Sequence, residues 1–213
     1  MLKAFLFDFD GTLADSAPGI LKTMEHTFLR MGIPVPAPEC MKATIGLPLK
    51  AALRQSGALS DADAERATIL YRELFASCEA GLVTLFPGVA ETLALLRSRG
   101  YRLAVVTSRD QRSLDLLLDR LCLADFFEDR ITGTDGFPPK PAPDMLVELL
   151  RRMCLSADEA VVVGDTAFDI LMGRGAGCRT IAVSYGNHTR SQLLAAGPTS
   201  VIDSFFQLNS LFE

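Results

Sequence analysis

The stretch Ala4-Phe5-Leu6-Phe7-Asp8-Phe9-Asp10-Gly11-Thr12 is the most informative part of this chain. Four apolar residues lead into two aspartates that are two positions apart, and a glycine follows. Within a strand, successive side chains point to opposite faces. Two carboxylates can therefore converge on one ligand only where the strand ends and the backbone turns, which Gly11 permits. The alternative is an ordinary turn, in which Asp10 caps the backbone and Gly11 supplies a positive φ.

Composition sets limits on what the chain can do. Its 213 residues are 49% hydrophobic, enough to bury a substantial core in one domain, or in one domain with a small insertion. The formal net charge of −5 argues against binding to nucleic acid or to an acidic membrane surface. No apolar stretch is long enough to span a bilayer, and Asp8 interrupts the short apolar run that a secretory signal would need. We expect a soluble, cytoplasmic protein.

Cysteine and histidine usage narrows the chemistry. The five cysteines are widely separated and form no C-x-x-C pair, which favours buried small hydrophobes in a reducing compartment over disulfides or a zinc site. Only two histidines are present, His26 and His188, so a histidine-based metal site or triad is nearly excluded. The cysteines are Cys40, Cys78, Cys122, Cys154 and Cys178.

Apolar runs rich in β-branched residues recur along the chain at the spacing of an α/β protein. The continuous hydrophobicity of Val161-Val162-Val163 indicates a strand that is covered on both faces, which is typical of a parallel sheet. Helical patterns lie between these runs. The expected strands are 2–9, 102–108, 130–133, 160–164, 179–184 and a short piece at 201–202, and the expected helices are 89–99, 111–123, 143–153 and 168–175.

Residues 15–81 interrupt this rhythm. The segment contains no convincing strand, whereas Ile20, Met24 and Phe28 repeat at helical spacing. Ser60 followed by Asp63 predicts an N-terminal cap that opens a later helix. We therefore predict a helical domain at 15–81, inserted into an α/β core formed by 1–14 and 82–213.

Three further polar motifs are predicted to lie where strands end, which is where open α/β sheets bind their ligands. Thr107-Ser108 closes one strand, Lys140 lies in a loop with two prolines, and Asp165 and Asp169 follow the valine run. Each has an ordinary explanation: a hydroxyl that opens a helix, a surface lysine, or a cap with a solvated carboxylate. Lys140, however, is the only lysine after Lys50.

Taken together, these residues have a physical logic. Four carboxylates (Asp8, Asp10, Asp165 and Asp169) in one crevice would repel one another and require a cation, and oxygen-only ligands favour a hard ion such as Mg²⁺. The ammonium group of Lys140 and a threonine hydroxyl would complete a receptor for a phosphoryl group. One carboxylate can attack phosphorus to give an aspartyl-phosphate, while a second acid transfers protons.

These four motifs, in this order, resemble the haloacid dehalogenase-like superfamily of phosphohydrolases, and within it the phosphoglycolate-phosphatase-like branch with a small helical cap. The resemblance covers essentially the whole chain. It implies a three-layer Rossmann-like α/β core with a parallel sheet, with residues 15–81 as the inserted cap. It also implies that Asp8 is the nucleophile, that Asp10 is the general acid and base, and that residues 11–15 form a mobile turn.

The resemblance also assigns the remaining residues. Asp8, the main-chain carbonyl of Asp10 and Asp165 would hold Mg²⁺, with Asp169 as an additional metal-site carboxylate. Thr107 and Lys140 would bind the transferring phosphoryl group, with Ser108 beside them. Substrate discrimination would come from the cap loop around Gly46, and Arg54 would approach a substrate carboxylate or second phosphate on closure; a solvated helix arginine is the alternative for Arg54. Lys42 and Lys50, also in the cap, are interpreted as surface lysines, and His188 as a structural or surface residue.

Variants within the family sharpen the expected reaction. Dehalogenases and phosphonoacetaldehyde hydrolases lack the second aspartate of the first motif. Because Asp10 is present here, neither of these activities is expected. One departure concerns the residues after Thr107, where relatives often have Asn-Lys and this chain has Ser108-Arg109. Arg109 is a cation near the site whose role the resemblance does not supply.

The expected function is a Mg²⁺-dependent phosphatase acting on a small phosphomonoester, such as a phosphoglycolate-like compound or a sugar phosphate, through an aspartyl-phosphate. Alternatives on the same fold are a phosphomutase of the β-phosphoglucomutase type, an inorganic pyrophosphatase and a nucleotide phosphatase. A non-enzymatic interaction module would predict erosion of the metal or nucleophile positions, and none is visible. The expected partner is a small phosphorylated metabolite, with neither nucleic acid nor membrane, and the chain is expected to be a monomer or homodimer.

Overall fold

A parallel sheet organises the fold, which we describe from a computed structural model covering residues 1–79 and 81–211. Its strand order is β5-β4-β1-β6-β7-β8, and every neighbouring pair is parallel. The strands are β1 (Ala4–Phe7), β4 (Arg102–Val106), β5 (Asp129–Ile131), β6 (Ala160–Gly164), β7 (Arg179–Val183) and β8 (Ser200–Ile202).

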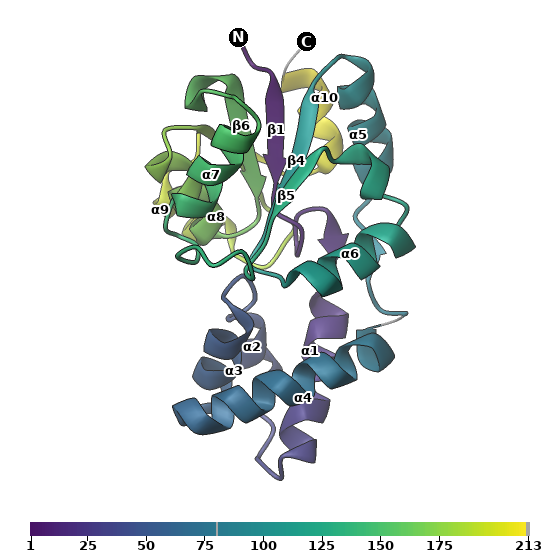
Figure 1. Cartoon of the computed structure of the whole chain (residues 1–213), viewed down its shortest axis with the longest axis vertical. Helices are drawn as coiled ribbons and strands as arrows, with labels where there is room; N and C mark the ends of the chain where they lie inside the picture. The colour runs from purple at the N-terminus through teal and green to yellow at the C-terminus, as the bar shows by residue number, and fades with distance from the viewer. Residues whose placement is uncertain (80, 212–213) are drawn as a thin grey trace.

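The central strand β1 places three strand ends side by side. In the register, Phe7 is aligned with Val105 of β4 and with Val163 of β6. The residues that follow β1, β4 and β6 therefore meet at one edge of the sheet. This edge faces downward in Figure 1.

Both faces of the sheet are covered, as the valine run predicts. Phe5 and Phe7 of β1 pack into one apolar cluster, and Leu6 packs into a second cluster on the opposite face. Figure 1 shows the two helical layers on either side of the strands. One face carries α5 (Val89–Ser98), α6 (Gln111–Arg120) and α10 (Leu208–Leu211), and the other carries α7 (Asp144–Arg152), α8 (Ala167–Gly175) and α9 (Arg190–Ala196). The three-layer Rossmann-like α/β class is confirmed.

Four helices lie apart from these layers, beyond the carboxyl ends of the strands (Figure 1). We call them the cap: α1 (Ala17–Arg30), α2 (Pro38–Lys42), α3 (Leu49–Gly57) and α4 (Asp61–Glu79). Two short strands that the sequence does not reveal, β2 (Ala14–Asp15) and β3 (Thr84–Leu85), pair antiparallel where the chain enters and leaves the cap. The domain boundary at 15–81 stays a prediction, but this strand pair brackets it.

Local signals decide where several elements begin and end. Ser60 Oγ accepts the Asp63 backbone N–H at 3.1 Å, and this is the N-terminal capping hydrogen bond that the sequence predicts for helix α4. The first strand ends at Phe7 and not at residue 9 as expected, because the backbone turns at the aspartates. Three single-turn 3₁₀ helices (Ala124–Phe126, Ala157–Glu159 and Phe205–Gln207) complete the described elements.

The prediction that the cysteines are buried small hydrophobes was wrong for most of them. All five are free thiols, and only Cys178 is buried. Cys122 and Cys154 are exposed in left-handed turns just after α6 and α7, with φ of 55° and 53°. Their hydrophobicity alone does not show that the chain turns outward at these points.

No helix within residues 1–79 and 81–211 combines the length and the apolar character that crossing a membrane requires.

Candidate active site

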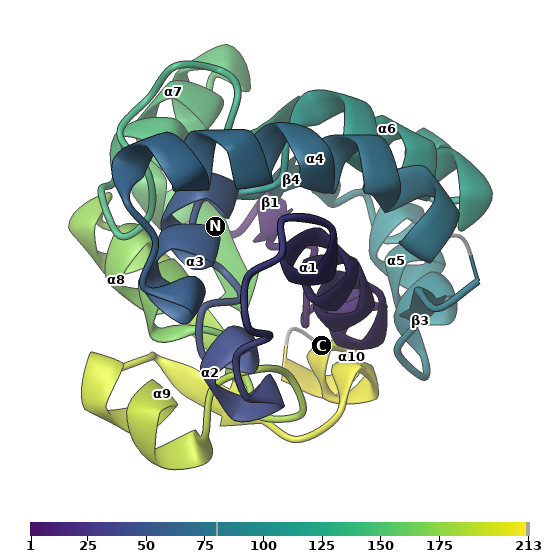
Figure 2. The same cartoon turned by 90° about the horizontal axis from the view of Figure 1, so that it is seen from below.

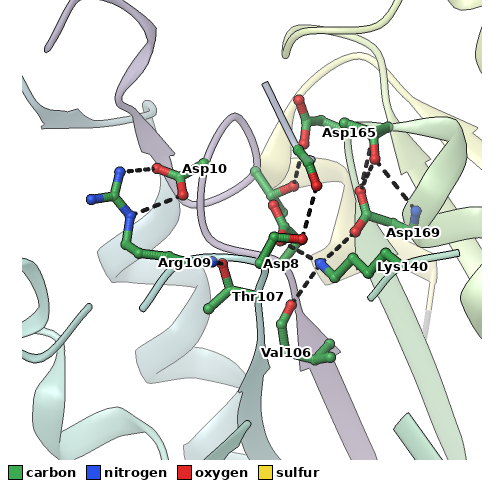
Figure 3. Close-up of polar contacts among 12 residues, drawn as sticks. Asp8, Asp10, Val106, Thr107, Arg109, Lys140, Asp165 and Asp169 are labelled. Atoms are coloured by element: carbon green, nitrogen blue, oxygen red, sulfur yellow. Dashed lines mark hydrogen bonds and ion pairs between the residues drawn. The ribbon is translucent and has the colours of Figure 1, made fainter. Parts of the chain in front are cut away.

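Lys140 connects two of the predicted site carboxylates at the edge of the sheet. Its Nζ atom donates hydrogen bonds to Asp8 Oδ1 at 2.6 Å, to Asp169 Oδ1 at 2.7 Å and to the backbone oxygen of Val106 at 2.8 Å (Figure 3). These three bonds use all three ammonium hydrogens. Burial alone would lower the pKa of Lys140, but the charges of Asp169 and Asp8 raise it above its ordinary value.

Three carboxylates form a buried acidic cluster: Asp8, Asp165 and Asp169. One oxygen of each lies within 4.8 Å of the others. Burial raises the pKa of Asp8 well above its usual range, Lys140 opposes this rise, and Asp169 adds to it. Burial and the neighbouring Asp169 raise the pKa of Asp165 to about 7. With all three carboxylates ionised, the cluster would carry more negative charge than one lysine can offset.

Asp165 and Asp169 are fixed by hydrogen bonds from the loops around them. Asn187 donates its backbone N–H at 2.7 Å and its Nδ2 at 2.9 Å to Asp165 Oδ2, and Thr12 Oγ1 donates to Asp165 Oδ1 at 3.2 Å. Asp169 Oδ2 accepts from the backbone N–H and the hydroxyl of Thr166, in the capping box of α8. The other oxygen of Asp169 thereby faces Lys140.

Two glycines allow the loops to pack directly onto Asp165. Gly11 has φ of +88°, and a Cβ atom there would lie 2.1 Å from Asp165 Oδ2. A Cβ atom on Gly186 would lie 2.3 Å from Asp165 Cβ and 2.5 Å from the backbone oxygen of Gly11. The turn that the first motif requires is therefore present, and it contacts the loop at 185–187.

Asp10 is held separately from the acidic cluster. Arg109 Nε donates to Asp10 Oδ2 at 2.9 Å and Arg109 Nη2 donates to Asp10 Oδ1 at 2.6 Å, as Figure 3 shows. Burial would raise the pKa of Asp10, but the charge and hydrogen bonds of Arg109 lower it below its ordinary value. This differs from the expectation that all four carboxylates share one cation. The two aspartates of the motif have different counterions and different environments.

Thr107 lies at the end of β4, between the two aspartates in Figure 3. It is buried, and its Oγ1 accepts the backbone N–H of Arg109 at 3.2 Å. Its hydroxyl hydrogen can still be donated to an oxygen of a ligand. Thr107 therefore contributes a hydroxyl at the cavity wall close to both aspartates.

A cavity of about 1020 Å³ separates the cap from these residues. Figure 2, viewed from the cap side, shows α1, α3 and α4 arranged around the strand ends. Ser108 crosses the gap, since its Oγ donates to the backbone oxygen of Gly46 in the cap at 2.8 Å. The predicted site residues that line the cavity are Asp8, Asp10, Gly46, Thr107 and Ser108.

Arg54 does not share this location. It is not among the residues that line the cavity, and its guanidinium pairs with Asp61 at 2.9 Å on the exposed surface of the cap. The solvated helix arginine that the sequence offered as the alternative describes this arrangement. Lys50 does line the cavity, but its Nζ pairs with the exposed Glu65, which does not line it, at 2.8 Å.

Three contributors to the site are not identified by the motifs alone. His188 Nδ1 accepts the backbone N–H of Ala167 at 3.0 Å, which is a structural role. Asn187, next to it, is the main hydrogen-bond donor to Asp165, and only the glycine-containing loop at 185–189 hints at it. Arg109 is visible in the sequence as a cation, but its pairing with Asp10 is not.

Comparison with known proteins identifies the family. The sequence profile described as Haloacid dehalogenase-like hydrolase matches residues 5–183. The protein called "Probable phosphatase IndB" from Dickeya dadantii is 39% identical over 216 residues, covering 98% of this chain and 92% of the relative. A phosphoglycolate phosphatase from Pectobacterium atrosepticum is 33% identical over 212 residues, covering 96% of this chain and 89% of its own length. The solved structure of a haloacid dehalogenase-like family hydrolase from Streptococcus pneumoniae superposes with a TM-score of 0.89 at 27% identity, covering 100% of this chain and 99% of that one.

This chain therefore belongs to the haloacid dehalogenase-like hydrolase family. Within that family it is an enzyme of the phosphatase class, in agreement with the relatives that match nearly its full length.

Proposed function

We propose that this enzyme is a Mg²⁺-dependent phosphatase that hydrolyses a small phosphomonoester through an aspartyl-phosphate on Asp8. The observation that carries the proposal is the position of Asp8, which lines the cavity while Lys140 and the acidic cluster surround it. Lys140 holds Asp8 Oδ1, and no hydrogen bond within the described residues engages Asp8 Oδ2. Asp8 Oδ2 is the oxygen suited to attack phosphorus.

The donor set at this site fits Mg²⁺. Asp8, Asp165 and Asp169 offer carboxylate oxygens only, and their mutual repulsion, seen in the raised pKa values of Asp8 and Asp165, is what a divalent cation would relieve. The backbone oxygen of Asp10 lies beside this group, 3.5 Å from the same Asn187 Nδ2 that contacts Asp165. Asp8, Asp165, this carbonyl and Asp169 would hold the ion. When bound, it supplies positive charge for the phosphoryl oxygens.

The reaction that we infer has two halves. Asp8 attacks phosphorus, the bond from phosphorus to the ester oxygen breaks, and Asp10, which enters this step protonated, gives its proton to that oxygen, which leaves as the alcohol. A water molecule then attacks the same phosphorus, Asp10 takes the proton from that water, and Asp8 is released with inorganic phosphate. Lys140 offsets the negative charge beside Asp8 throughout, and the Thr107 hydroxyl donates to a phosphoryl oxygen.

The substrate that we propose is a small phosphorylated metabolite of the phosphoglycolate or sugar phosphate kind. Several relatives named phosphoglycolate phosphatase support this class, including that of Vibrio parahaemolyticus, 32% identical over 216 residues. We place the activity in the cytoplasm, in keeping with five cysteines that are all free thiols. A monomer or homodimer stays a prediction.

The test is phosphate release from a panel of small phosphoesters, with phosphoglycolate and pyrophosphate included. The wild type and Asp8→Asn are compared in Mg²⁺ and in EDTA, and Asp158→Asn, which removes an exposed carboxylate, serves as the matched control. We expect turnover that requires Mg²⁺, survives in Asp158→Asn and is lost in Asp8→Asn. Acid-quenched wild type should retain labelled phosphate from substrate. Turnover by purified Asp8→Asn, with contaminating phosphatase excluded, would contradict the mechanism.

A further inference from the structure

Arg109 is an unusually enclosed cation for a residue that lines a cavity. Its side chain is only 6% exposed, and the side chain of Asp10, with which it pairs, is 14% exposed. The two hydrogen bonds, at 2.6 Å and 2.9 Å, join both carboxylate oxygens to two guanidinium nitrogens. This parallel fork fixes both the position and the plane of the carboxylate, which a single hydrogen bond cannot do.

The guanidinium is held in turn by two aromatic rings. The Arg109 Cζ atom lies 5.8 Å from the ring centre of Phe9 and 5.1 Å from that of Phe75, within the range of a cation–π interaction. Phe9 separates the two aspartates of the first motif, whereas Phe75 belongs to α4 of the cap and is 7% exposed. Arg109 therefore contacts the cap on one side and Asp10 on the other.

This arrangement has a consequence for proton transfer. A general acid contributes only when its oxygen lies within hydrogen-bond reach of the reacting oxygen, and small misplacements are costly. Asp10 is two residues from Asp8 and close to a buried negative cluster, so it needs its own counterion to stay in a defined position. As found, both oxygens of Asp10 accept from Arg109. When Asp10 carries a proton, one of these hydrogen bonds gives way to the leaving oxygen, and the other keeps the carboxyl group in position.

We propose that Arg109 is the positioning residue for Asp10 in this phosphatase, and that Phe75 makes this positioning depend on the cap. The proposal rests on the proposed function, in which Asp10 protonates the leaving oxygen as the bond from phosphorus to that oxygen breaks. It distinguishes Arg109 from a residue that only attracts substrate, because a positioning residue matters in proportion to how much the leaving group needs a proton.

Two phosphoesters of similar size separate these roles. The benzyl alkoxide that leaves from benzyl phosphate is a strong base and needs the proton, whereas the nitrophenolate that leaves from p-nitrophenyl phosphate is a weak base and does not. We expect Arg109→Met to lower kcat/KM for benzyl phosphate by about tenfold and kcat/KM for p-nitrophenyl phosphate by less than about threefold. We compare kcat/KM because it reports the half-reaction in which the ester bond breaks and not the later attack by water, which both esters share. The measured quantity is the ratio of kcat/KM for benzyl phosphate to that for p-nitrophenyl phosphate. Arg109→Lys, which keeps the charge but loses the two parallel hydrogen bonds, should restore part of this ratio.

Arg112→Met is the matched control. Arg112 is an exposed arginine on α6 that lines the same cavity, so its loss removes the same charge without disturbing Asp10. We expect this variant to leave the ratio of the two kcat/KM values unchanged. The second control is Asp10→Asn, which should itself lower the ratio of benzyl phosphate to p-nitrophenyl phosphate hydrolysis. Adding Arg109→Met to Asp10→Asn should depress it no further, because the group to be positioned is already gone.

Several outcomes would overturn the proposal. An equal loss on both esters in Arg109→Met would make Arg109 a substrate-binding residue, and faster benzyl phosphate hydrolysis would make it a restraint on Asp10. Additive losses in the double variant would show that Arg109 does not act through Asp10. If circular dichroism shows that Arg109→Met does not fold, Phe75→Leu takes its place and should lower the same ratio by a smaller factor; an unchanged ratio there would refute the link to the cap.

Failure of the proposed function gives a different result. Hydrolysis of p-nitrophenyl phosphate that persists in Asp8→Asn, or that is absent from the wild type, contradicts the phosphatase mechanism whatever Arg109 does, and the positioning role falls with it. Hydrolysis that is lost in Asp8→Asn, with an unchanged ratio in folded Arg109→Met, contradicts the positioning role alone.

Discussion

Replacing Lys140 with methionine tests whether the buried ammonium group holds the site together. Methionine has a similar length and fills similar space, but it donates no hydrogen bond. The change leaves Asp8 and Asp169 without the cation that lies 2.6 Å and 2.7 Å from them, and it leaves the backbone oxygen of Val106 without its donor at 2.8 Å. Lys140 is 3% exposed, so water cannot replace these contacts easily.

The size of the effect follows from the burial of the partners. Removing one partner from a buried ion pair costs about 3–5 kcal/mol of unfolding free energy, because the remaining charge is left uncompensated. For a chain of this length, 1 kcal/mol shifts the melting temperature by about 2–4 °C. Lys140→Met should therefore melt about 6–20 °C below the wild type.

The pH dependence gives the sign of the electrostatic contribution. Without Lys140, burial raises the pKa of Asp8 further in the folded state, because the opposing charge is gone. A carboxyl group with a raised pKa in the folded state binds its proton more tightly there than in the unfolded chain. The variant's stability therefore falls as the pH rises, and its deficit relative to the wild type should be larger at pH 8 than at pH 5.

The assay is thermal unfolding followed by circular dichroism in EDTA at both pH values. Lys50→Met is the control, since the side chains of Lys50 and its partner Glu65 are 47% and 57% exposed and a surface pair contributes little. We expect Lys50→Met to melt with the wild type. A Lys140→Met variant that also melts with the wild type at pH 8, or that shows the same deficit at both pH values, would refute the reasoning.

Two further predictions concern Asp165 and its surroundings. Burial and Asp169 raise the pKa of Asp165 from 3.8 to about 7, so the folded state holds this proton more tightly than the unfolded chain does. In EDTA the melting temperature should therefore fall as the pH rises from about 4 to 7, and saturating Mg²⁺ or Asp165→Asn should flatten this slope. An unchanged slope would count against the metal site. In Gly186→Ala the new methyl group would lie 2.5 Å from the backbone oxygen of Gly11, so we expect a lower melting temperature and at least about a tenfold loss of kcat. In the control Gly175→Ala the nearest neighbour of the new methyl group would be 3.4 Å away, so this variant should behave as the wild type. Equal behaviour of the two variants would contradict the close-approach argument.

The sheet could be predicted because its signal is local. The three consecutive valines at 161–163 indicate a strand that is covered on both faces, and the same kind of apolar run marks its neighbours. The strands β2 and β3, at the entrance to and exit from the cap, could not be predicted, because a strand of two residues has no periodicity. They pair only because the fold brings residues 14–15 and 84–85 together. The exposed Cys122 and Cys154 were missed for a related reason: burial depends on which way a turn directs the chain, and hydrophobicity does not show this.

Within the site, residue types at strand ends were predictable and the pairing between them was not. The sequence places Asp8, Lys140 and Asp169 at the edge of a parallel sheet, but Asp8 and Lys140 are separated by 132 positions, and nothing local states that one ammonium group contacts both carboxylates. The D-x-D motif likewise suggests that Asp10 joins the cluster. Asp10 pairs instead with Arg109, which also contacts Phe75 of the cap, and this arrangement exists only in three dimensions.

The two cations of the site are not interchangeable, and their difference explains how neighbouring aspartates can be given separate roles. Lys140 donates to three acceptors that belong to three different segments, which suits the three hydrogens of an ammonium group and would not suit a planar fork. Arg109 donates two parallel hydrogen bonds to one carboxylate, which an ammonium group cannot do, and its Cζ atom lies 5.1 Å from the ring centre of Phe75. The lysine therefore holds Asp8 within the cluster, and the arginine holds Asp10 outside it. The two carboxylates are only two residues apart at the end of one strand, but they consequently lie in different environments. This difference is the condition for one to act as nucleophile and the other to carry protons.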